Sequence, residues 1–367
     1  MSTSGKVIRC RAAVFIEPNK PLTVEQVLVD CPQADEVRVK LYASGVCRSD
    51  ASSIWGKRGD CFVPYGKPMI NGHEGSGVVE SVGEQVTDVE VGDHVVLLWL
   101  PQCNQCVKCK NPTTNTCMVA LSRGDCEEGW LPADGISRFH LVADGRPVLT
   151  PSTNCNLATF AEYCIAKQSM VVKIDKTLPL DVMSVFGCAL PTGYGAAANV
   201  AKVHAGSTCA VWGLGAVGMA VVLGCKLMGA NVIIGIDINS DKYETAKQFG
   251  CNQFINPLDT TESADVVIKS IFSNSLFFEE GVDYTFDCIG NQSVIEAAIR
   301  SLCPSGTFVA VGLLQPQHTY TLPVMRLLDG LTLTGGLFGN YKGKDGVIML
   351  TNKYKTDSNF RRLVDQF

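Results

Sequence analysis

One glycine motif limits the possible folds of this chain more than any other feature. Gly213-Leu-Gly215-Ala-Val-Gly218 follows the apolar run Cys209–Trp212 and opens a stretch of helical spacing that reaches Met228. A second apolar run, Val232–Ile236, comes directly after it. In such a strand–helix–strand unit the first glycine makes the turn, the second lets a pyrophosphate approach, and the third lets helix and strand pack closely. The motif therefore predicts a doubly wound parallel sheet with a dinucleotide site.

The type of dinucleotide is indicated by the residue that ends the second predicted strand. Asp237 lies about 20 residues after the glycines, where a carboxylate accepts the hydroxyl groups of the adenosine ribose. A 2′-phosphate at that place meets a like charge. We therefore expect NAD rather than NADP, with its phosphates on the helix N-terminus that Gly213, Gly215 and Gly218 open.

The remaining chain has room for a second domain. It has 367 residues, of which 46% are hydrophobic. Its first part alternates apolar and polar residues, as strands do, and its later part alternates strands with helices. Strands are expected at Ala12–Phe15, Val37–Leu41, Gly77–Val82, His94–Leu98, Asp283–Asp287 and Phe308–Val311, and helices at Leu180–Phe186, Gly193–Val203 and Lys242–Phe249. We expect a catalytic domain at 1–190, a nucleotide-binding domain at 191–332, and a return to the first domain at 333–367.

Composition excludes several classes of protein. The net charge is −5 and no basic run stands out, so we expect no nucleic-acid partner. No apolar stretch approaches the length of a membrane span, and the N-terminus does not resemble a signal peptide. The sequence therefore predicts a cytoplasmic protein, in which the 17 cysteines serve as metal ligands or as small buried residues rather than as disulfides.

Four of the cysteines are crowded together. They are Cys103, Cys106, Cys109 and Cys117. Four thiolates at this spacing suit a tetrahedral zinc ion, and an iron–sulfur cluster is the alternative. Since four cysteines leave no open coordination position, we expect a structural site.

Three further segments contain metal-binding residue types at long separations. Cys47 lies in Gly45–Asp50, His73 in Gly72–Gly77, and Cys188 shortly before Thr192. Each has an ordinary structural interpretation as well, as a core thiol or as a hydrogen-bonded histidine in a turn. Spacing alone does not show that the three converge on one metal ion.

Taken in order, these segments resemble the zinc-containing medium-chain alcohol dehydrogenases from about Cys10 to Gly346. The similarity rests on Gly72-His-Glu-Gly75, the four-cysteine segment, Pro191-Thr-Gly-Tyr-Gly195, the glycine motif, and Gly235-Ile-Asp-Ile-Asn239. The resemblance implies a β-rich, partly open-barrel (GroES-like) catalytic domain joined to a Rossmann domain, with the active site between them. It also implies two zinc ions per subunit, NAD, an alcohol or aldehyde substrate, and a homodimer formed through the edge strand near Leu331–Thr334.

The resemblance assigns roles at the catalytic zinc. Cys47, His73 and Cys188 are its implied ligands, with water or the alcohol in the fourth position. Glu74 is expected behind the metal, where it tunes the site. Ser49 is the residue that accepts the proton of the alcohol.

The resemblance also assigns residues to the cofactor. Arg48 is expected at the pyrophosphate, and Asp237 and Lys242 at the adenosine ribose. Thr192 and Val217 are expected at the nicotinamide.

The sequence departs from the family pattern at several places. Ser52 stands where many members have a histidine that relays protons. Trp99 is not a departure: the resemblance implies that it lines the substrate pocket. Lys57–Asp60 and Met118–Leu121 lack the residues typical of the glutathione-dependent formaldehyde dehydrogenases. Family chains also continue further than Phe367, so the return is expected to be shortened. The segments Lys57–Asp60 and Met118–Leu121 weaken the interpretation as a glutathione-dependent formaldehyde dehydrogenase, which stays one alternative. A non-catalytic NAD-binding or structural protein is the other alternative, because of the shortened return.

Overall fold

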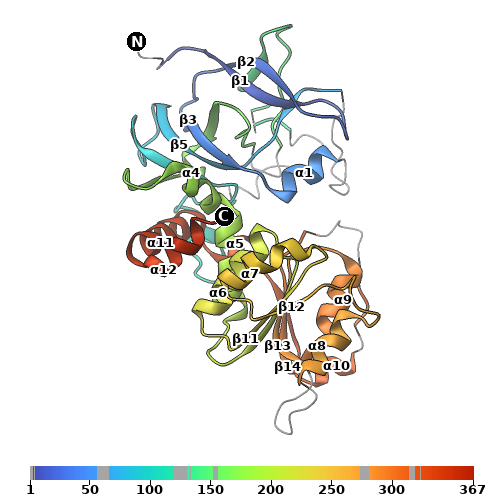
Figure 1. The fold of residues 1–367 in the computed structure, drawn as a ribbon. Helices are drawn as coiled ribbons and strands as arrows, with labels where there is room; N and C mark the ends of the chain where they lie inside the picture. The colour runs from blue at the N-terminus through green and yellow to red at the C-terminus, as the bar shows by residue number, and fades with distance from the viewer. Residues whose placement is uncertain are drawn as a thin grey trace. The chain divides into compact units, whose positions relative to one another are not determined.

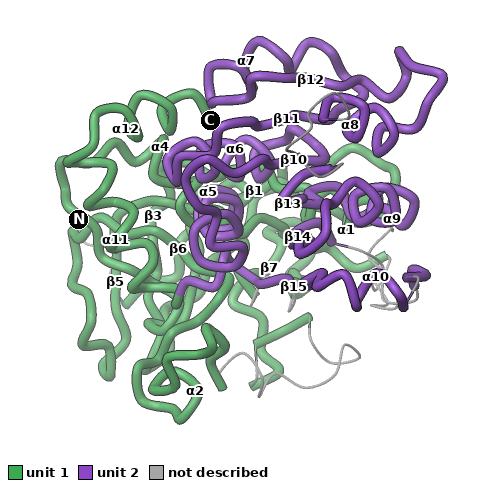
Figure 2. The backbone as a smooth tube through the Cα atoms, turned by 90° about the horizontal axis from the view of Figure 1, so that it is seen from below, with its two compact units in different colours: residues 1–188, 342–367 green, residues 189–341 purple. Residues whose placement is uncertain are grey.

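The computed structural model divides into two compact units, coloured separately in Figure 2. Unit 1 combines residues 1–188 with residues 342–367, and unit 2 contains residues 189–341. Unit 1 is thus built from both ends of the chain, and unit 2 is inserted between them. The described residues are 3, 5–55, 66–118, 130–132, 134–151, 156–272, 281–313, 319–322 and 324–367.

Unit 1 contains two antiparallel sheets. Its strands are β1 (Ile8–Phe15), β2 (Thr23–Val29), β3 (Glu36–Gly45), β4 (Met69–Ile70), β5 (Glu74–Val82), β6 (His94–Leu97), β7 (Phe139–Leu141), β8 (Tyr163–Lys167) and β9 (Val171–Ile174). The sheet orders are β8-β3-β5-β6-β9 and β4-β1-β2-β7. Each sheet packs around its own apolar cluster, one including Val39 and Val95 and the other including Val14 and Val27. The alternation of buried and exposed residues that predicted these strands is the consequence of this one-sided packing.

The helices of unit 1 are short except for α11 near the C-terminus. They are α1 (Arg48–Ile54), α2 (Val107–Lys110), η2 (Gln168–Met170), α4 (Leu180–Met183), η3 (Ser184–Gly187), α11 (Gly343–Thr356) and α12 (Ser358–Val364). Helices α11 and α12 pack on each other (Figure 1), and α11 also contacts β9 and η3. The ring of Tyr354 meets that of Phe186 edge-on, with centroids 6.1 Å apart. The C-terminal segment is therefore an integral part of unit 1.

Unit 2 is built on one parallel sheet. Its strands are β10 (Thr208–Trp212), β11 (Val232–Ile236), β12 (Gln253–Ile255), β13 (Val282–Asp287), β14 (Leu302–Ala310) and β15 (Thr332–Gly335). The order is β12-β11-β10-β13-β14-β15, so the chain reverses direction across the sheet between β12 and β13. This is the strand order of a dinucleotide-binding Rossmann fold. Strand β10 lies inside the sheet and all its residues are buried, which explains its continuous apolar run.

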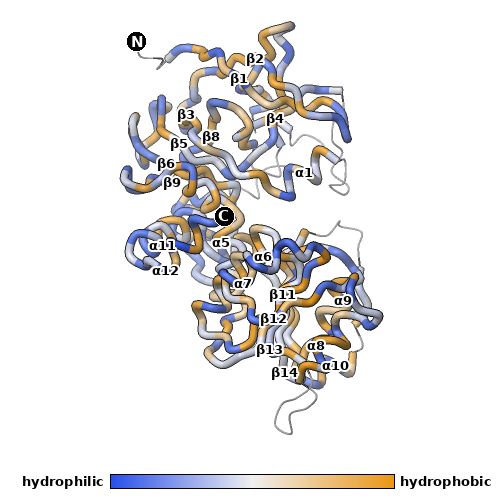
Figure 3. Tube along the Cα trace, viewed as in Figure 1, coloured by the Kyte–Doolittle hydropathy of each residue, from blue (hydrophilic) through white to orange (hydrophobic). Residues whose placement is uncertain are grey.

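Helices cover both faces of this sheet. They are α5 (Ala189–Gly195), the π-helix η4 (Ala196–Ala201), α6 (Ala216–Leu227), η5 (Ser240–Lys242), α7 (Tyr243–Phe249), α8 (Ala264–Phe272), α9 (Gln292–Arg300), α10 (Met325–Leu328) and η6 (Leu337–Asn340). Helices α8 and α9 share an apolar cluster with Ala210 and Trp212, whereas α6 packs on the opposite face near Val211. Figure 3 shows hydrophobic and hydrophilic segments alternating along α9, as one-sided burial requires. The expected fold class is confirmed.

The expected elements are present, but one helix is less regular than its spacing indicated. The helix expected at Gly193–Val203 is α5 followed by a π-helical turn, which ends at the left-handed Lys202. A side chain at Gly195 would lie 2.4 Å from the carbonyl oxygen of Gly339. This close contact with η6 is tertiary and leaves no periodic signal in the sequence. Among the described residues, no helix has the length and apolar character needed to cross a membrane.

Candidate functional site

A tight turn between β4 and β5 positions His73. Gly72 in this turn has φ +95°, and a β-carbon there would lie 2.4 Å from the hydroxyl oxygen of Thr159. Only glycine fits both the backbone angle and the space. The turn therefore places His73, which is 2% exposed, directly before Glu74 at the start of β5.

Two other segments bring cysteines to the same place. Cys47 is the N-cap residue of α1, and Cys188 follows η3. The donor atoms of Cys47, His73, Glu74 and Cys188 all lie within 4.8 Å of one another. Residues that are 141 positions apart in the sequence, Cys47 and Cys188, thus form one buried cluster of possible metal ligands within unit 1.

Asp50 supports this cluster from behind, although no sequence motif pointed to it. It is fully buried. One carboxylate oxygen accepts hydrogen bonds from Nδ1 of His73 at 3.2 Å and from the backbone N–H of Gly72 at 3.1 Å. The other accepts from the backbone N–H of Cys47 at 3.3 Å. A carboxylate that holds Nδ1 leaves Nε2 for a metal ion, which is how proteins orient histidine ligands.

The protonation of the cluster fits a site that a cation completes. A hydrogen bond from the Cys188 thiol is the main cause that lowers the pKa of Cys47 to about 3, against the effect of burial. Burial opposes the charging of His73, yet its bonds to Asp50 and Cys47 raise its pKa to about 10. Burial mainly raises the pKa of Glu74 to about 8. The cluster therefore combines groups that exchange protons with one another, and such donor groups release protons when a divalent cation binds.

The four cysteines of the crowded segment form a second cluster. The sulfur atoms of Cys103, Cys106, Cys109 and Cys117 lie within 4.8 Å of one another. Cys106 caps α2, and its sulfur accepts backbone N–H bonds from Cys109 at 3.3 Å and Met118 at 3.5 Å. These bonds, that from Met118 first, lower the pKa of Cys106 to about 6. Since thiolates are the form that binds metal, the segment fits a four-sulfur metal site.

The glycine motif in unit 2 has the geometry that a phosphate site requires. A β-carbon at Gly218 would lie 1.9 Å from the carbonyl oxygen of Gly213, so the helix and the strand approach as closely as glycine allows. A β-carbon at Gly215, the N-cap residue of α6, would meet nothing within 4 Å. The helix N-terminus is thus open to a ligand.

Asp237 lies beside this motif. Its carboxylate accepts a 2.8 Å hydrogen bond from the backbone N–H of Leu214 and a 2.9 Å bond from Nζ of Lys242. Burial raises the pKa of Asp237, but Lys242 and two backbone N–H groups lower it below its ordinary value. The structure therefore brings together the predicted ribose-binding pair and the phosphate loop.

The surroundings of the remaining predicted site residues do not by themselves indicate their roles. The hydroxyl of Thr192 is buried without a hydrogen-bond partner, and a β-carbon at the neighbouring Gly193 would lie 2.2 Å from the carbonyl oxygen of Val217. Arg48 is exposed, with its guanidinium 5.0 Å from the ring centroid of Trp55. Ser49 follows on α1 and is half-buried.

Two other predictions concern the substrate pocket and the segments compared with the glutathione-dependent enzymes. Trp99 packs beside the apolar cluster around Val95. Lys57–Asp60 lies outside the described residues, as does most of Met118–Leu121.

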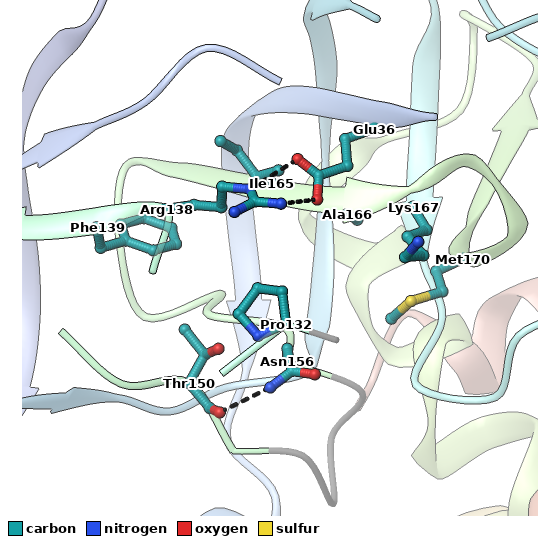
Figure 4. A pocket seen from close by; sticks show the side chains of 10 residues that line it. All are labelled: Glu36, Pro132, Arg138, Phe139, Thr150, Asn156, Ile165, Ala166, Lys167 and Met170. Atoms are coloured by element: carbon teal, nitrogen blue, oxygen red, sulfur yellow. Dashed lines mark hydrogen bonds and ion pairs between the residues drawn. The ribbon is translucent and has the colours of Figure 1, made fainter. Parts of the chain in front are cut away.

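A third polar region of unit 1 is a cavity in which the charges are already paired (Figure 4). Nε and Nη2 of Arg138 each donate a 2.9 Å bond to the carboxylate of Glu36. Nη2 also lies 2.6 Å from Asp134. Two carboxylates thus pair with one guanidinium, so the charged groups of Glu36 and Arg138 in this cavity already have partners within the protein.

Comparison with known proteins agrees with both units. The family model described as "Alcohol dehydrogenase GroES-like domain" matches residues 33–176, and the one described as "Zinc-binding dehydrogenase" matches residues 216–352. The chain belongs to the zinc-containing medium-chain alcohol dehydrogenase family, and it is an oxidoreductase of the alcohol dehydrogenase type.

Individual relatives are similar over nearly their whole length. The alcohol dehydrogenase class-3 of Drosophila melanogaster is 43% identical over 372 residues, which covers 100% of this chain and 92% of that protein. The benzyl alcohol dehydrogenase structure from Acinetobacter calcoaceticus has a TM-score of 0.82 at 29% identity and covers 98% of this chain and 91% of its own. An alcohol dehydrogenase zinc-binding domain protein from Burkholderia ambifaria has a TM-score of 0.84 at 29% identity, covering 97% and 92%.

Proposed function

We propose that this protein is an NAD-dependent alcohol dehydrogenase with two zinc ions per subunit, which interconverts small alcohols and their aldehydes or ketones. The observation that carries the proposal is the convergence of Cys47, His73 and Cys188 around a buried centre supported by Asp50. Two cysteines and one histidine leave a fourth position open for substrate, as in catalytic zinc sites, and alcohol dehydrogenases are themselves the best-known proteins with this ligand set.

A zinc ion held there supplies a Lewis acid that polarises the oxygen of the alcohol or aldehyde. The chain's own residues set up the site. Asp50 keeps the His73 ring oriented through Nδ1, and both His73 and Cys188 are buried. Glu74 belongs to the same group of donor atoms, and we assign it to tuning the charge of the site.

Unit 2 is proposed to hold NAD, which supplies the hydride acceptor. The open N-terminus of α6 at Gly215 would bind the pyrophosphate, together with Arg48. Asp237 and Lys242 would bind the adenosine ribose. The unpartnered hydroxyl of Thr192 supports a hydrogen bond to the nicotinamide end, where Val217 also contributes.

Ser49 is proposed to receive the proton that leaves the alcohol. A hydroxyl can accept and donate at once, so it can pass the proton onward. Ser52, one helical turn further along α1, cannot ionise near neutral pH as a histidine would. The proton is therefore proposed to leave through water or buffer.

The cellular setting follows from the same chemistry. Six of the seven proposed zinc ligands are cysteines, which bind metal only as reduced thiols, and this supports a location in the cytoplasm.

We further propose a homodimer in which strand β15 pairs with its copy. Strand β15 ends the sheet, and the neighbouring α10 exposes Met325 by 70% and Leu328 by 76%.

The proposal is tested by metal analysis and by turnover with a panel of alcohols and aldehydes, each with NAD and with NADP. Two zinc ions and NAD-linked turnover are expected. Hydroxymethylglutathione belongs in the panel, since strong preference for it would favour the glutathione-dependent alternative. Binding of NAD without turnover of any substrate would favour the non-catalytic alternative.

A further inference from the structure

A lysine from the far end of the chain holds the four-cysteine segment. Lys342 immediately precedes α11, and its Nζ donates hydrogen bonds to three backbone carbonyl oxygens, those of Cys109, Asn111 at 2.9 Å and Thr114 at 3.2 Å. An ammonium group has three N–H bonds, so its donors are fully used. All three acceptors lie in the stretch that joins the third cysteine of the cluster to the fourth, Cys117.

The other side of the segment is held by the same part of the chain. Gln102, which is 2% exposed, directly precedes Cys103. Its side-chain oxygen accepts backbone N–H bonds from Lys344 at 2.8 Å and from Asp345 at 3.2 Å. These are N–H groups of the first turn of α11, which need acceptors outside the helix. The start of α11 thus forms hydrogen bonds with the cysteine segment on both of its flanks.

The contacts of Lys342 complement the contacts to sulfur. Carbonyl oxygens repel thiolates, and three carbonyl oxygens of the segment accept hydrogen bonds from the positively charged Lys342. The N–H groups of Cys109 and Met118 meanwhile point to the sulfur of Cys106. Four thiolates and one divalent ion together carry two negative charges, which a nearby ammonium stabilises.

We infer that Lys342 is a positioning residue for the four-cysteine metal site, and that metal binding there and docking of α11 stabilise each other. The inference rests on the proposed second zinc ion. Coupling of this kind is reciprocal, because a contact that favours the metal-bound segment is itself favoured by the metal. Through Lys342 and Gln102, a metal bound near residue 110 fixes a helix more than 200 positions later in the sequence.

The experiment uses the holoenzyme and three variants: Lys342→Met, Gln102→Leu, and Lys108→Met as the matched control. Lys108 is an exposed lysine of the same segment, so its loss removes a nearby charge but leaves the hydrogen bonds of Lys342 and Gln102 intact. Zinc release to a coloured chelator is followed together with amide hydrogen exchange of residues 343–356. Circular dichroism verifies that each variant is folded.

Release from the four-cysteine site should be about tenfold faster in Lys342→Met, because charge-assisted hydrogen bonds are lost. Release of the other zinc should be unchanged, and exchange in α11 should rise. Removing the four-cysteine zinc from the wild type should also raise exchange in α11. If Lys342→Met does not fold, two measurements decide the question. These are zinc release with α11 exchange in Gln102→Leu, and α11 exchange in the wild type after removal of the four-cysteine zinc.

The outcomes separate the inference from the proposed function. A holoenzyme with a single zinc ion would contradict the proposed function and the inference together. Two zinc ions, with release rates and α11 exchange unaffected by Lys342→Met, would overturn the inference alone. Equal acceleration by Lys108→Met would also overturn it, since general electrostatics would then explain the effect.

Discussion

At the scale of single residues, the two metal clusters differ in the number of cysteine and histidine ligands, and this difference predicts different roles. Cys188 and His73 are buried, whereas Cys106 and Cys109 are partly exposed and lie on a short loop helix. The cluster around His73 has three protein ligands besides Glu74, and the four-cysteine cluster, in which Cys117 is fully buried, has four. Only the former leaves a coordination position for substrate.

Cys188→Ser should therefore remove one zinc ion and most turnover while the fold persists. Cys106→Ser should mainly lower thermal stability, because a closed metal site contributes to folding. Zinc content, turnover and the melting temperature of the two variants distinguish these effects. Equal loss of folding in both variants would contradict the division of roles.

Asp237 is the residue on which the preference for NAD depends. Its carboxylate already accepts bonds from Leu214 and Lys242, so a 2′-phosphate there would meet a fixed negative charge. Such placement costs up to several kcal/mol. Asp237→Gly should reduce the preference for NAD over NADP at least about tenfold in kcat/KM. A wild type that uses both cofactors equally would show that Asp237 does not contact the ribose.

Ser52 gives a prediction about pH. A histidine at this position of α1 has an ordinary pKa of about 6.5 and can accept the exported proton near neutral pH. Ser52→His should raise alcohol oxidation near pH 7 and leave NAD binding unchanged, while imidazole buffers should stimulate the wild type but not Ser52→His. Ser53→His is not a suitable control because Ser53 is buried, so Ser52→Ala serves instead. Identical pH–rate profiles for all three proteins would mean that proton export does not limit turnover.

At the scale of elements, the ion pair in Figure 4 joins the two sheets of unit 1. Glu36 begins β3 of the five-stranded sheet, and Arg138 directly precedes β7 of the other. Both side chains are about 5% exposed. Glu36→Gln should destabilise the protein by about 3 kcal/mol, because it leaves a buried guanidinium with one charged partner fewer. Chemical denaturation measures this, and Glu162→Gln, at an exposed arginine pair, is the control with a small effect.

Asp134 makes the same cluster sensitive to acid. Burial raises its pKa, but Arg138 lowers it below its ordinary value overall. A carboxyl with a lower pKa in the folded state stabilises the protein above its unfolded pKa, near 4, and this contribution is lost as pH falls through the folded pKa. Part of the acid lability should therefore disappear in Asp134→Asn, as measured by unfolding between about pH 2 and 5.

At the scale of the whole molecule, the proposed dimer gives a direct test. Leu328 on α10 and Ile348 on α11 are both exposed apolar residues, at 76% and 45%. Only Leu328 lies beside the edge strand β15 in the chain. Leu328→Asp should shift the protein from dimer to monomer in analytical ultracentrifugation, and Ile348→Asp should not. A monomeric wild type would contradict the proposal.

The local patterns of the sequence determined the elements and the residue types of each site. Alternation predicted β3 and β5, and the glycine motif together with Asp237 predicted the Rossmann sheet, because these signals depend on contacts between near neighbours. The four-cysteine cluster was predictable for the same reason, since its members span only 103–117. The family resemblance supplied the ligand set of the other metal site, whose members are far apart.

What only the tertiary structure decided involves residues whose partners are distant in the chain. Asp50 carries a signal only in retrospect, as a carboxylate three residues after an N-cap. Its bond to His73, the convergence of Cys47 with Cys188, and the three carbonyl bonds of Lys342 depend on how strands and helices pack. A single sequence records the periodicity of each element but not the distances between elements. These contacts therefore became visible only when the chain was folded.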